Sequence, residues 1–200
     1  MTGARSGIGE AIARQAVDAG AQVAGFARTA SDGFANGIHS FRCDVRDEDQ
    51  VQRGIDRAAD ALGGHLDGIV ANAGYGLYGH ITKGNPKDWY EVVQTNVMGL
   101  LYTVYYGYQK LPADGLRAIP LMSSLRGRNA RLGAAVSAST KYAVPALADS
   151  LRPPLTHQQV PVPLTAQRHA AHPLSALPVP PAPPPAPPHP SKPITGTRRP

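Results

Sequence analysis

Cysteine is nearly absent from this 200-residue sequence. Cys43 stands alone, so no disulfide framework can form within the chain. A protein without disulfides fits a reducing compartment. The sequence also lacks an apolar run of the roughly 20 residues that a membrane-spanning helix needs, and it shows no charged-then-apolar leader. We therefore expect a cytoplasmic protein that does not enter a membrane.

Acidic residues are missing from the last quarter of the chain. The last carboxylate is Asp149, and five of the 20 lysines and arginines follow it. The net charge of +6 therefore comes mainly from the C-terminal end, and the preceding part is close to neutral. A nucleic-acid-binding face would need basic residues concentrated on the folded part, so we predict no nucleic-acid partner. We predict no metal site.

Proline, in contrast, is concentrated at the C-terminal end. Sixteen of the twenty prolines lie in residues 153–200, and such a segment cannot bury a core. We predict a folded domain over residues 1–164 and a Pro-rich low-complexity tail over 165–200, disordered or in polyproline II. Recognition of the run at 178–190 by an SH3 or WW partner is the alternative to a plain unstructured tail.

Glycine occurs where a nucleotide-binding turn needs it. Gly3, Gly7 and Gly9 fall in the opening stretch, and an apolar helical pattern follows at once. Glycine lets a backbone approach a ligand closely, and the first-turn N–H groups and dipole of a helix favour an anion. The stretch therefore predicts a dinucleotide pyrophosphate at the start of this helix. A glycine triplet alone suits a plain turn equally well.

Strands and helices are predicted to alternate along the chain. Apolar periodicity and Gly-rich turns predict helices over residues 7–19, 47–62, 86–110 and 137–152, and strands over 21–27, 41–45, 66–71 and 116–124. This order implies an α/β fold, a Rossmann-type doubly wound parallel sheet with helices on both faces.

Parts of this predicted sheet are irregular. Only Met1 and Thr2 precede Gly3, so the first strand is nearly missing. A strand over 160–164 contains Pro161 and Pro163, which remove ladder donors from one side. Because residues of the same parity point their N–H groups to one side, we expect this strand to pair through its other side, as an edge.

The predicted elements carry an ordered set of short motifs. Each is weak alone, but together, over residues 1–152, the sequence resembles the short-chain dehydrogenase/reductase family. The resemblance implies an oxidoreductase that moves hydride between a nicotinamide dinucleotide and a carbonyl or alcohol. The motifs are Thr2-Gly3-x-x-x-Gly7-x-Gly9, Asp44-Val45, Asn72-Ala73-Gly74, Asn96-Val97, Ser123-Ser124 at a strand end, and Lys141 in Lys-Tyr-Ala-Val.

The resemblance also implies four catalytic positions. Ser124 would polarise the substrate oxygen, Asn96 would position a relay water, and Lys141 would activate a tyrosine four residues earlier, on the same helix face. That position is Ser137, so the phenol is missing. Tyr142 lies about 100° around the helix and should face elsewhere. A positioned acid–base group worth about 10²–10⁴-fold is therefore lost, which predicts reduced or absent catalysis.

The cofactor preference depends on Arg28, which follows the second predicted strand. An acidic residue there would bind the ribose 2′-hydroxyl of NAD, whereas an arginine accommodates the 2′-phosphate of NADP. Arg28, with Arg5, therefore predicts NADP(H) over NAD(H), and a solvated surface arginine is the alternative. The resemblance assigns further cofactor contacts to Gly3, Ser6, Gly7, Ile8, Gly9, Asp44, Val45, Asn72, Ala73, Gly74 and Lys141.

Three functions stay open at this point. The first is an NADP(H)-dependent oxidoreductase acting on a small carbonyl or alcohol, impaired by Ser137. The second is a non-catalytic dinucleotide-binding module or a defective gene product, and the third is a Pro-rich interaction protein. The resemblance also implies a homo-oligomer formed through the long helix and the helix that carries Lys141.

Overall fold

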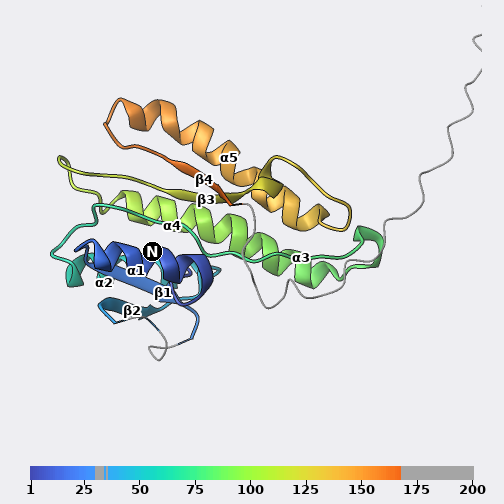
Figure 1. The fold of residues 1–200 in the computed structure, drawn as a ribbon, viewed down its shortest axis with the longest axis horizontal. Coiled ribbons are helices and arrows are strands. Elements are labelled where there is room, and N and C mark those ends of the chain that lie inside the picture. Colours follow the sequence, from blue (N-terminus) through green and yellow to red (C-terminus); the bar gives the residue numbers. More distant parts are fainter. Residues whose placement is uncertain (30–33, 35, 168–200) are drawn as a thin grey trace, which may run out of the picture.

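The structure, a computed structural model, describes residues 1–29, 34 and 36–167. Over this part it has the alternating helices and strands of an α/β fold, as the sequence predicts (Figure 1). The predicted tail lies outside the described residues from position 168 on, and the predicted domain boundary at 164 falls at the start of the last strand. The elements are, in chain order, α1 (Gly7–Asp18), β1 (Val23–Ala27), β2 (Ile38–Arg42), α2 (Glu48–Ala61), the short helix η1 (Ile81–Lys83), α3 (Pro86–Val93), the π-helical segment η2 (Gln94–Met98), α4 (Gly99–Tyr108), β3 (Leu121–Ser124), the short helix η3 (Leu125–Gly127), α5 (Ala135–Thr156) and β4 (Leu164–Gln167).

The parallel sheet is divided into two pairs of strands. β1 pairs with β2, with Phe26 opposite Phe41, and β3 pairs with β4, with Leu121 opposite Leu164. The first strand is reduced to its last residues, as the sequence predicts, so the sheet lacks a central strand long enough to bond both neighbours. Single parallel bridges connect the pairs through the chain start and residues 66–71: Thr2 with Phe26, Gly68 with Ala118, and Ala71 with Leu121.

A cavity of about 450 Å³ lies beside the shortened strand. Ile12 of α1, Val23 of β1 and Ile55 of α2 line it together with residues 65–70. The predicted catalytic residues do not line this cavity.

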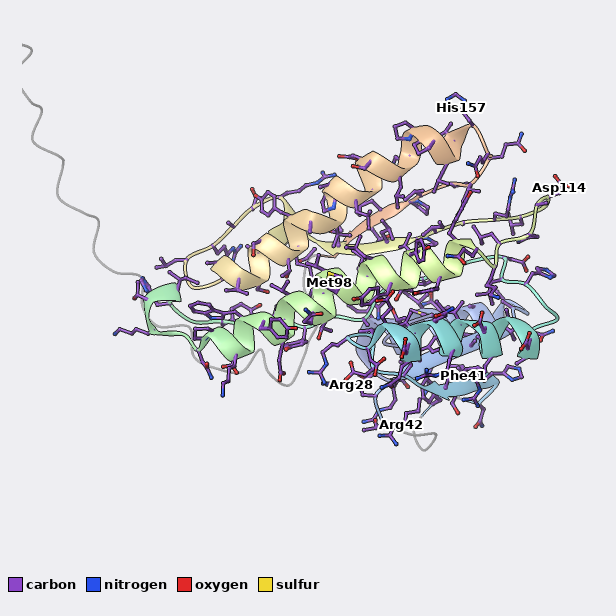
Figure 2. All side chains as sticks on the ribbon, turned by 180° about the vertical axis from the view of Figure 1, so that it is seen from behind. Arg28, Phe41, Arg42, Met98, Asp114 and His157 are labelled. Carbon is purple, nitrogen blue, oxygen red and sulfur yellow. The ribbon has the colours of Figure 1, made fainter. Side chains whose placement is uncertain are left out.

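α3, η2 and α4 form one continuous rod that lies between the two halves of the molecule in both views (Figures 1 and 2). The buried core is divided in the same way. One cluster surrounds Leu121 and Val144 beside β3 and α5, and another surrounds Phe26 and Val51 beside β1 and α2. Because the sheet is interrupted, each half buries its own apolar side chains.

The prediction of one regular helix over 86–110 is wrong at its centre. η2 widens the helix to π-helical geometry over residues 94–98, and α4 ends at Tyr108. Apolar spacing does not reveal such a turn, because Val92 before it and Leu100 after it are both buried on the core side. The wide turn matters for function because it contains Asn96.

The prolines of the last strand behave differently from our prediction. The carbonyl oxygens of Pro161 and Pro163 accept from the N–H groups of Ile119 and Leu121, each at 2.9 Å. In a parallel ladder the N–H and C=O of one residue point to the same neighbour. The strand therefore pairs through its proline side, not the other side. The proline carbonyls still accept hydrogen bonds, and only the bonds that a proline nitrogen cannot donate are lost.

Several element bounds also differ from those predicted. β2 begins at Ile38, inside the expected loop, and β3 begins only at Leu121, directly after Pro120. α5 continues four residues past its predicted end, through Pro153 and Pro154. The carbonyls that these prolines leave unbonded lie on an exposed part of the helix, where water can bond them.

Across the described residues, none of the helices has the length and apolar character that crossing a membrane requires.

Candidate active site

The glycine-rich turn opens directly into α1. Gly3 (φ +67°) and Gly7 (φ +61°) adopt the left-handed backbone that favours glycine. A Cβ built at Gly9 would lie 2.0 Å from the Gly3 carbonyl oxygen, so only glycine lets the turn close this tightly. Ser6 is the N-cap, and its side chain makes no capping bond. The first-turn N–H groups, including that of Ile8, therefore have no side-chain cap and are open to an anion.

Gly9→Ala should destabilise the protein strongly. The added methyl would meet backbone of Gly3 and the Asn72 amide, which lies 2.5 Å from the same position, and backbone cannot move aside cheaply. We expect a loss of about 3 kcal/mol, the upper end for an overpacked site, together with loss of dinucleotide binding. Urea denaturation followed by circular dichroism measures it. Gln15→Ala, an exposed change on the same helix, should leave stability within about 0.5 kcal/mol, and a Gly9→Ala variant equally stable would contradict the prediction.

Asn72 holds the turn to the central part of the sheet. Its Nδ2 donates to the carbonyl oxygens of Thr2 and Gly3, each at 3.2 Å. The backbone N–H groups of Asn72 and Ala73 donate to the Thr2 hydroxyl, at 3.1 and 3.2 Å. Asn72 is thus a brace within the fold. The exposed Gly74 is the residue of this stretch that is open to a ligand.

Two arginines lie at the carboxyl end of β1. Arg28 follows the strand and is exposed. Figure 2 shows it on the side of the molecule that carries Phe41 and Arg42, away from Asp114 and His157. Arg5, from the glycine-rich turn, donates a hydrogen bond to the hydroxyl of Thr29. The structure therefore ties the turn to the residue after Arg28, at the edge of the sheet where α/β proteins bind their ligands.

Asp44, the predicted adenine contact, is engaged by Arg46. The guanidinium donates to both carboxylate oxygens, from Nε at 3.0 Å and from Nη2 at 2.6 Å. This bonding holds the pKa of the Asp44 carboxyl below its ordinary value, and the charge of Arg28 acts more weakly in the same direction. The side chain of Val45 is buried in the core. Our sequence reasoning missed Arg46, which the close Asp-x-Arg spacing could have indicated.

Asn96 lies buried in η2 and bonds to two other elements. Its Oδ1 accepts from the N–H of Tyr75 at 3.0 Å, and its Nδ2 donates to the Tyr75 carbonyl at 2.9 Å and to the Thr140 hydroxyl at 3.0 Å. A Cβ built at Gly74 would lie 2.9 Å from Asn96 Oδ1 and 3.4 Å from Lys141 Nζ. The two predicted residues therefore meet over Gly74. Burial lowers the pKa of the Lys141 ammonium.

Ser137 lies one turn before Lys141 on α5 and is only 2% exposed. Its hydroxyl lies 3.5 Å from the position of a Cβ at Gly76. Ser124 ends β3, which packs against α5, and is half-buried. Tyr142 directly follows Lys141 on α5, so it lies about 100° around the helix and is 44% exposed. Three of the four predicted catalytic residues, Asn96, Ser137 and Lys141, therefore lie around residues 74–76.

Sequence reasoning missed three residues here. Tyr75 and Thr140 supply the partners of Asn96, and Tyr78 lies near the Ser137 hydroxyl. Thr140 could have been found, because it follows Ser137 by three residues and so shares its helix face. Nothing in the sequence indicated either tyrosine, since the path of residues 72–80 depends on tertiary contacts.

The residues present fit a dinucleotide. An uncapped helix start, exposed arginines and a lysine over an exposed glycine all lie where parallel strands end, and nothing lies within 4 Å of a Cβ position at Gly7. This combination suits a ligand with a pyrophosphate and two riboses. Within residues 1–29, 34 and 36–167, no cluster of three or more His, Cys, Asp or Glu side chains could hold a metal ion.

Comparisons with known proteins agree with this geometry. The model of the short chain dehydrogenase family matches residues 1–167. The human Dehydrogenase/reductase SDR family member 11 is 28% identical over 181 residues, which cover 82% of this chain and 69% of that protein. The ligand-free aldohexose dehydrogenase of Thermoplasma acidophilum has a TM-score of 0.73 at 26% identity, covering 84% of this chain and 62% of that one. A structure titled "ElxO with NADP Bound" has a TM-score of 0.77 at 24% identity, covering 85% and 73%.

The fold defines an α/β protein of the Rossmann type, and the candidate site residues lie at the carboxyl ends of its strands. With the family match over most of the chain, the protein belongs to the short-chain dehydrogenase family of oxidoreductases. Our prediction of the family and of its fold class is thereby confirmed. The chain spans about two thirds of the length of the relatives named above.

Proposed function

We propose that this chain is an NADP(H)-dependent oxidoreductase that interconverts a small carbonyl compound and an alcohol, with a rate limited by the missing phenol at Ser137. The observation that carries this proposal is the convergence over Gly74 of Asn96 and the Lys141 ammonium, beside the Ser137 hydroxyl. An ammonium and a buried amide at the end of a nucleotide-binding sheet suit a reaction at a polar carbonyl oxygen.

Each residue contributes a definite step. A bound dinucleotide would supply or accept the hydride. The N–H groups of the turn would bind its pyrophosphate, and the Lys141 ammonium would orient its nicotinamide ribose. Ser124 donates a hydrogen bond to the substrate oxygen. Asn96 fixes the backbone of Tyr75 and thereby the segment over which the substrate would lie.

NADP(H) is the preferred cofactor under this proposal because the part of the site that would hold the adenosine ribose is basic. Arg28 is exposed, and Arg5 is bonded to the adjacent Thr29, so both guanidinium groups are close to the end of β1. A 2′-phosphate binds best to paired arginine donors. The carboxylate of Asp44, whose pKa the charge of Arg28 helps to lower, is already engaged by Arg46 and would repel a phosphate less than an unpaired one.

Arg28→Glu should reverse the cofactor preference. Loss of a charge-assisted bond to phosphate costs about 1.5–3 kcal/mol, which is roughly a 10- to 100-fold weaker Kd for NADPH. The Kd for NADH should change by less than about threefold. Quenching of protein fluorescence on titration with each dinucleotide measures both. Arg53→Glu, an exposed residue of α2, makes the same change of net charge away from the site and serves as control.

Failure of either result bears directly on the proposal. If the unaltered protein binds neither NADPH nor NADH, the proposed function is wrong. If Arg28→Glu and Arg53→Glu weaken NADPH binding equally, the effect is one of net charge and the role of Arg28 is wrong.

A second candidate function is a dinucleotide-binding module without catalysis. The observation that favours it is the buried serine at position 137 in place of an acid–base group. It predicts NADPH binding without turnover of any carbonyl. The two candidates are separated by a turnover assay with hexanal, benzaldehyde, cyclohexanone and diacetyl, following NADPH absorbance.

We also propose a homo-oligomer formed along the α3–η2–α4 rod. Tyr90, Leu101 and Tyr105 are exposed on it, and Tyr90 and Tyr105 are each more than 60% exposed. Aromatic side chains in such a row suit the core of an interface between two copies.

The domain over residues 1–164 with a separate tail remains our proposal for the chain as a whole.

A further inference from the structure

Tyr78 brings a phenol to the position where the site lacks one. Its hydroxyl oxygen and the Ser137 hydroxyl each lie 3.5 Å from the point where a Cβ at Gly76 would be. The two oxygens are therefore at most about 7 Å apart, and both border a residue that has no side chain.

We propose that the Tyr78 phenol is the general acid of this enzyme, delivering to the substrate oxygen the proton that Ser137 cannot supply. The proposal rests on the proposed function, since it concerns the proton of the same carbonyl reduction. It assigns a catalytic role to a residue of the 72–80 segment, which in Figure 1 runs alongside the α3–η2–α4 rod from the sheet to η1.

The segment that carries Tyr78 is held on both sides. Tyr75 is bonded through its backbone to Asn96, and the N–H of Gly79 donates to the Gly133 carbonyl at 2.8 Å, just before α5. The backbone next to Tyr78 is thus bonded to the segment that leads into α5, the helix that carries Ser137. A fixed backbone is what a proton donor needs to stay in reach of its substrate.

The step balances with groups already named. The reduced dinucleotide of the proposed function would supply hydride to the carbonyl carbon, where a C–H bond would form. The electron pair of the C=O π bond moves to oxygen, which takes the proton as the Tyr78 O–H bond breaks. The products are the alcohol, the oxidised dinucleotide and a phenolate, which regains a proton from water. Tyr78 is 51% exposed, so water reaches it.

Lys141 supports this role from the neighbouring position. Its ammonium faces the point above Gly74, two residues before Gly76, so both groups border one open strip of backbone. A substrate oxygen over that strip has an ammonium on one side and a phenol on the other. The alternative is that Tyr78 only covers the site and a water molecule supplies the proton.

The variant Tyr78→Phe distinguishes a proton-donating role of Tyr78 from a covering role. It keeps the ring and removes only the hydroxyl, so a covering role would survive. We expect kcat in the carbonyl panel above to fall about 10²-fold, the lower end for a positioned general acid, with the Kd for NADPH unchanged. Tyr90→Phe, an exposed tyrosine of α3, should change neither value. Adding Ser137→Tyr to Tyr78→Phe should restore turnover.

A second readout does not need turnover. The Kd for NADPH, measured by quenching of protein fluorescence, should be the same in Tyr78→Phe and in the unaltered protein. Unchanged kcat in Tyr78→Phe would overturn the proposal while leaving NADPH binding, and so the dinucleotide site, intact. Turnover by Ser137→Tyr but not by the unaltered protein would overturn it as well. A loss of NADPH affinity equal to the loss of kcat would assign Tyr78 to binding and also overturn it.

Discussion

Ser137→Tyr should raise kcat for carbonyl reduction about 100-fold over the unaltered protein. A positioned acid–base group contributes about 10²–10⁴-fold, and the lower end applies because the Tyr78 phenol already supplies part of it. The new side chain would start one turn before Lys141 on α5, and the neighbouring residue 76 has no side chain to oppose it. NADPH oxidation with the same four carbonyl compounds measures the gain.

The gain should depend on Tyr78. In the Tyr78→Phe background, Ser137→Tyr should raise kcat by up to about 10⁴-fold, since no other phenol remains there. The Kd for NADPH should stay within twofold in both backgrounds, because neither residue contacts the phosphates in the proposed arrangement. Ser139→Tyr, an exposed position on α5, is the matched control and should change nothing. No gain in either background would mean that the rest of the site is not assembled for catalysis.

The parts of this molecule that could be predicted from its sequence are those set by local chemistry. The glycines at 3, 7 and 9 encode a turn that only glycine can form, and the structure has positive φ or a close backbone approach at each. Asp47, three residues before Gln50, encodes a helix N-cap, and its side chain accepts from the Gln50 N–H. In these places the residue type and the neighbouring residues determine the conformation.

Other features could not be predicted because partners distant in sequence decide them. The π-helical turn at Asn96 bonds that side chain to Tyr75 and Thr140, 21 and 44 residues away. The proline strand pairs through carbonyls, because Ile119 and Leu121 offer donors on that side. Periodicity records which face of an element is apolar. It does not record which neighbour supplies a hydrogen bond.

The Asn96 network also explains why the site stays together despite a divided sheet. Three elements meet there: the rod through η2, the 72–80 segment through Tyr75, and α5 through Thr140. The two strand pairs share few ladder bonds, so the hydrogen bonds of one buried amide carry much of the alignment between the segment and the helix that bears Lys141. Removing that amide should therefore have a large effect on both stability and chemistry.

Asn96→Leu should cost about 3–5 kcal/mol of the free energy of unfolding. The substitution keeps the volume but leaves the Tyr75 N–H and carbonyl unpaired, and each such buried group costs about 1–3 kcal/mol. A domain stable by about 5–15 kcal/mol loses much of its margin. Urea denaturation measures the loss, and turnover should fall with it because the 72–80 segment is no longer fixed.

Two further variants test whether the effect is specific to the Asn96 side chain. Thr95→Ala changes the adjacent residue of η2, whose hydroxyl bonds only the Glu91 carbonyl on an exposed face, and should cost less than about 0.5 kcal/mol. Thr140→Val removes a single partner of Asn96 and should cost about 1 kcal/mol. Because both residues share one bond, the loss in the double variant Asn96→Leu/Thr140→Val should be smaller than the sum of the two single losses. Strict additivity, or an Asn96→Leu variant as stable as Thr95→Ala, would show that this amide does not hold the site.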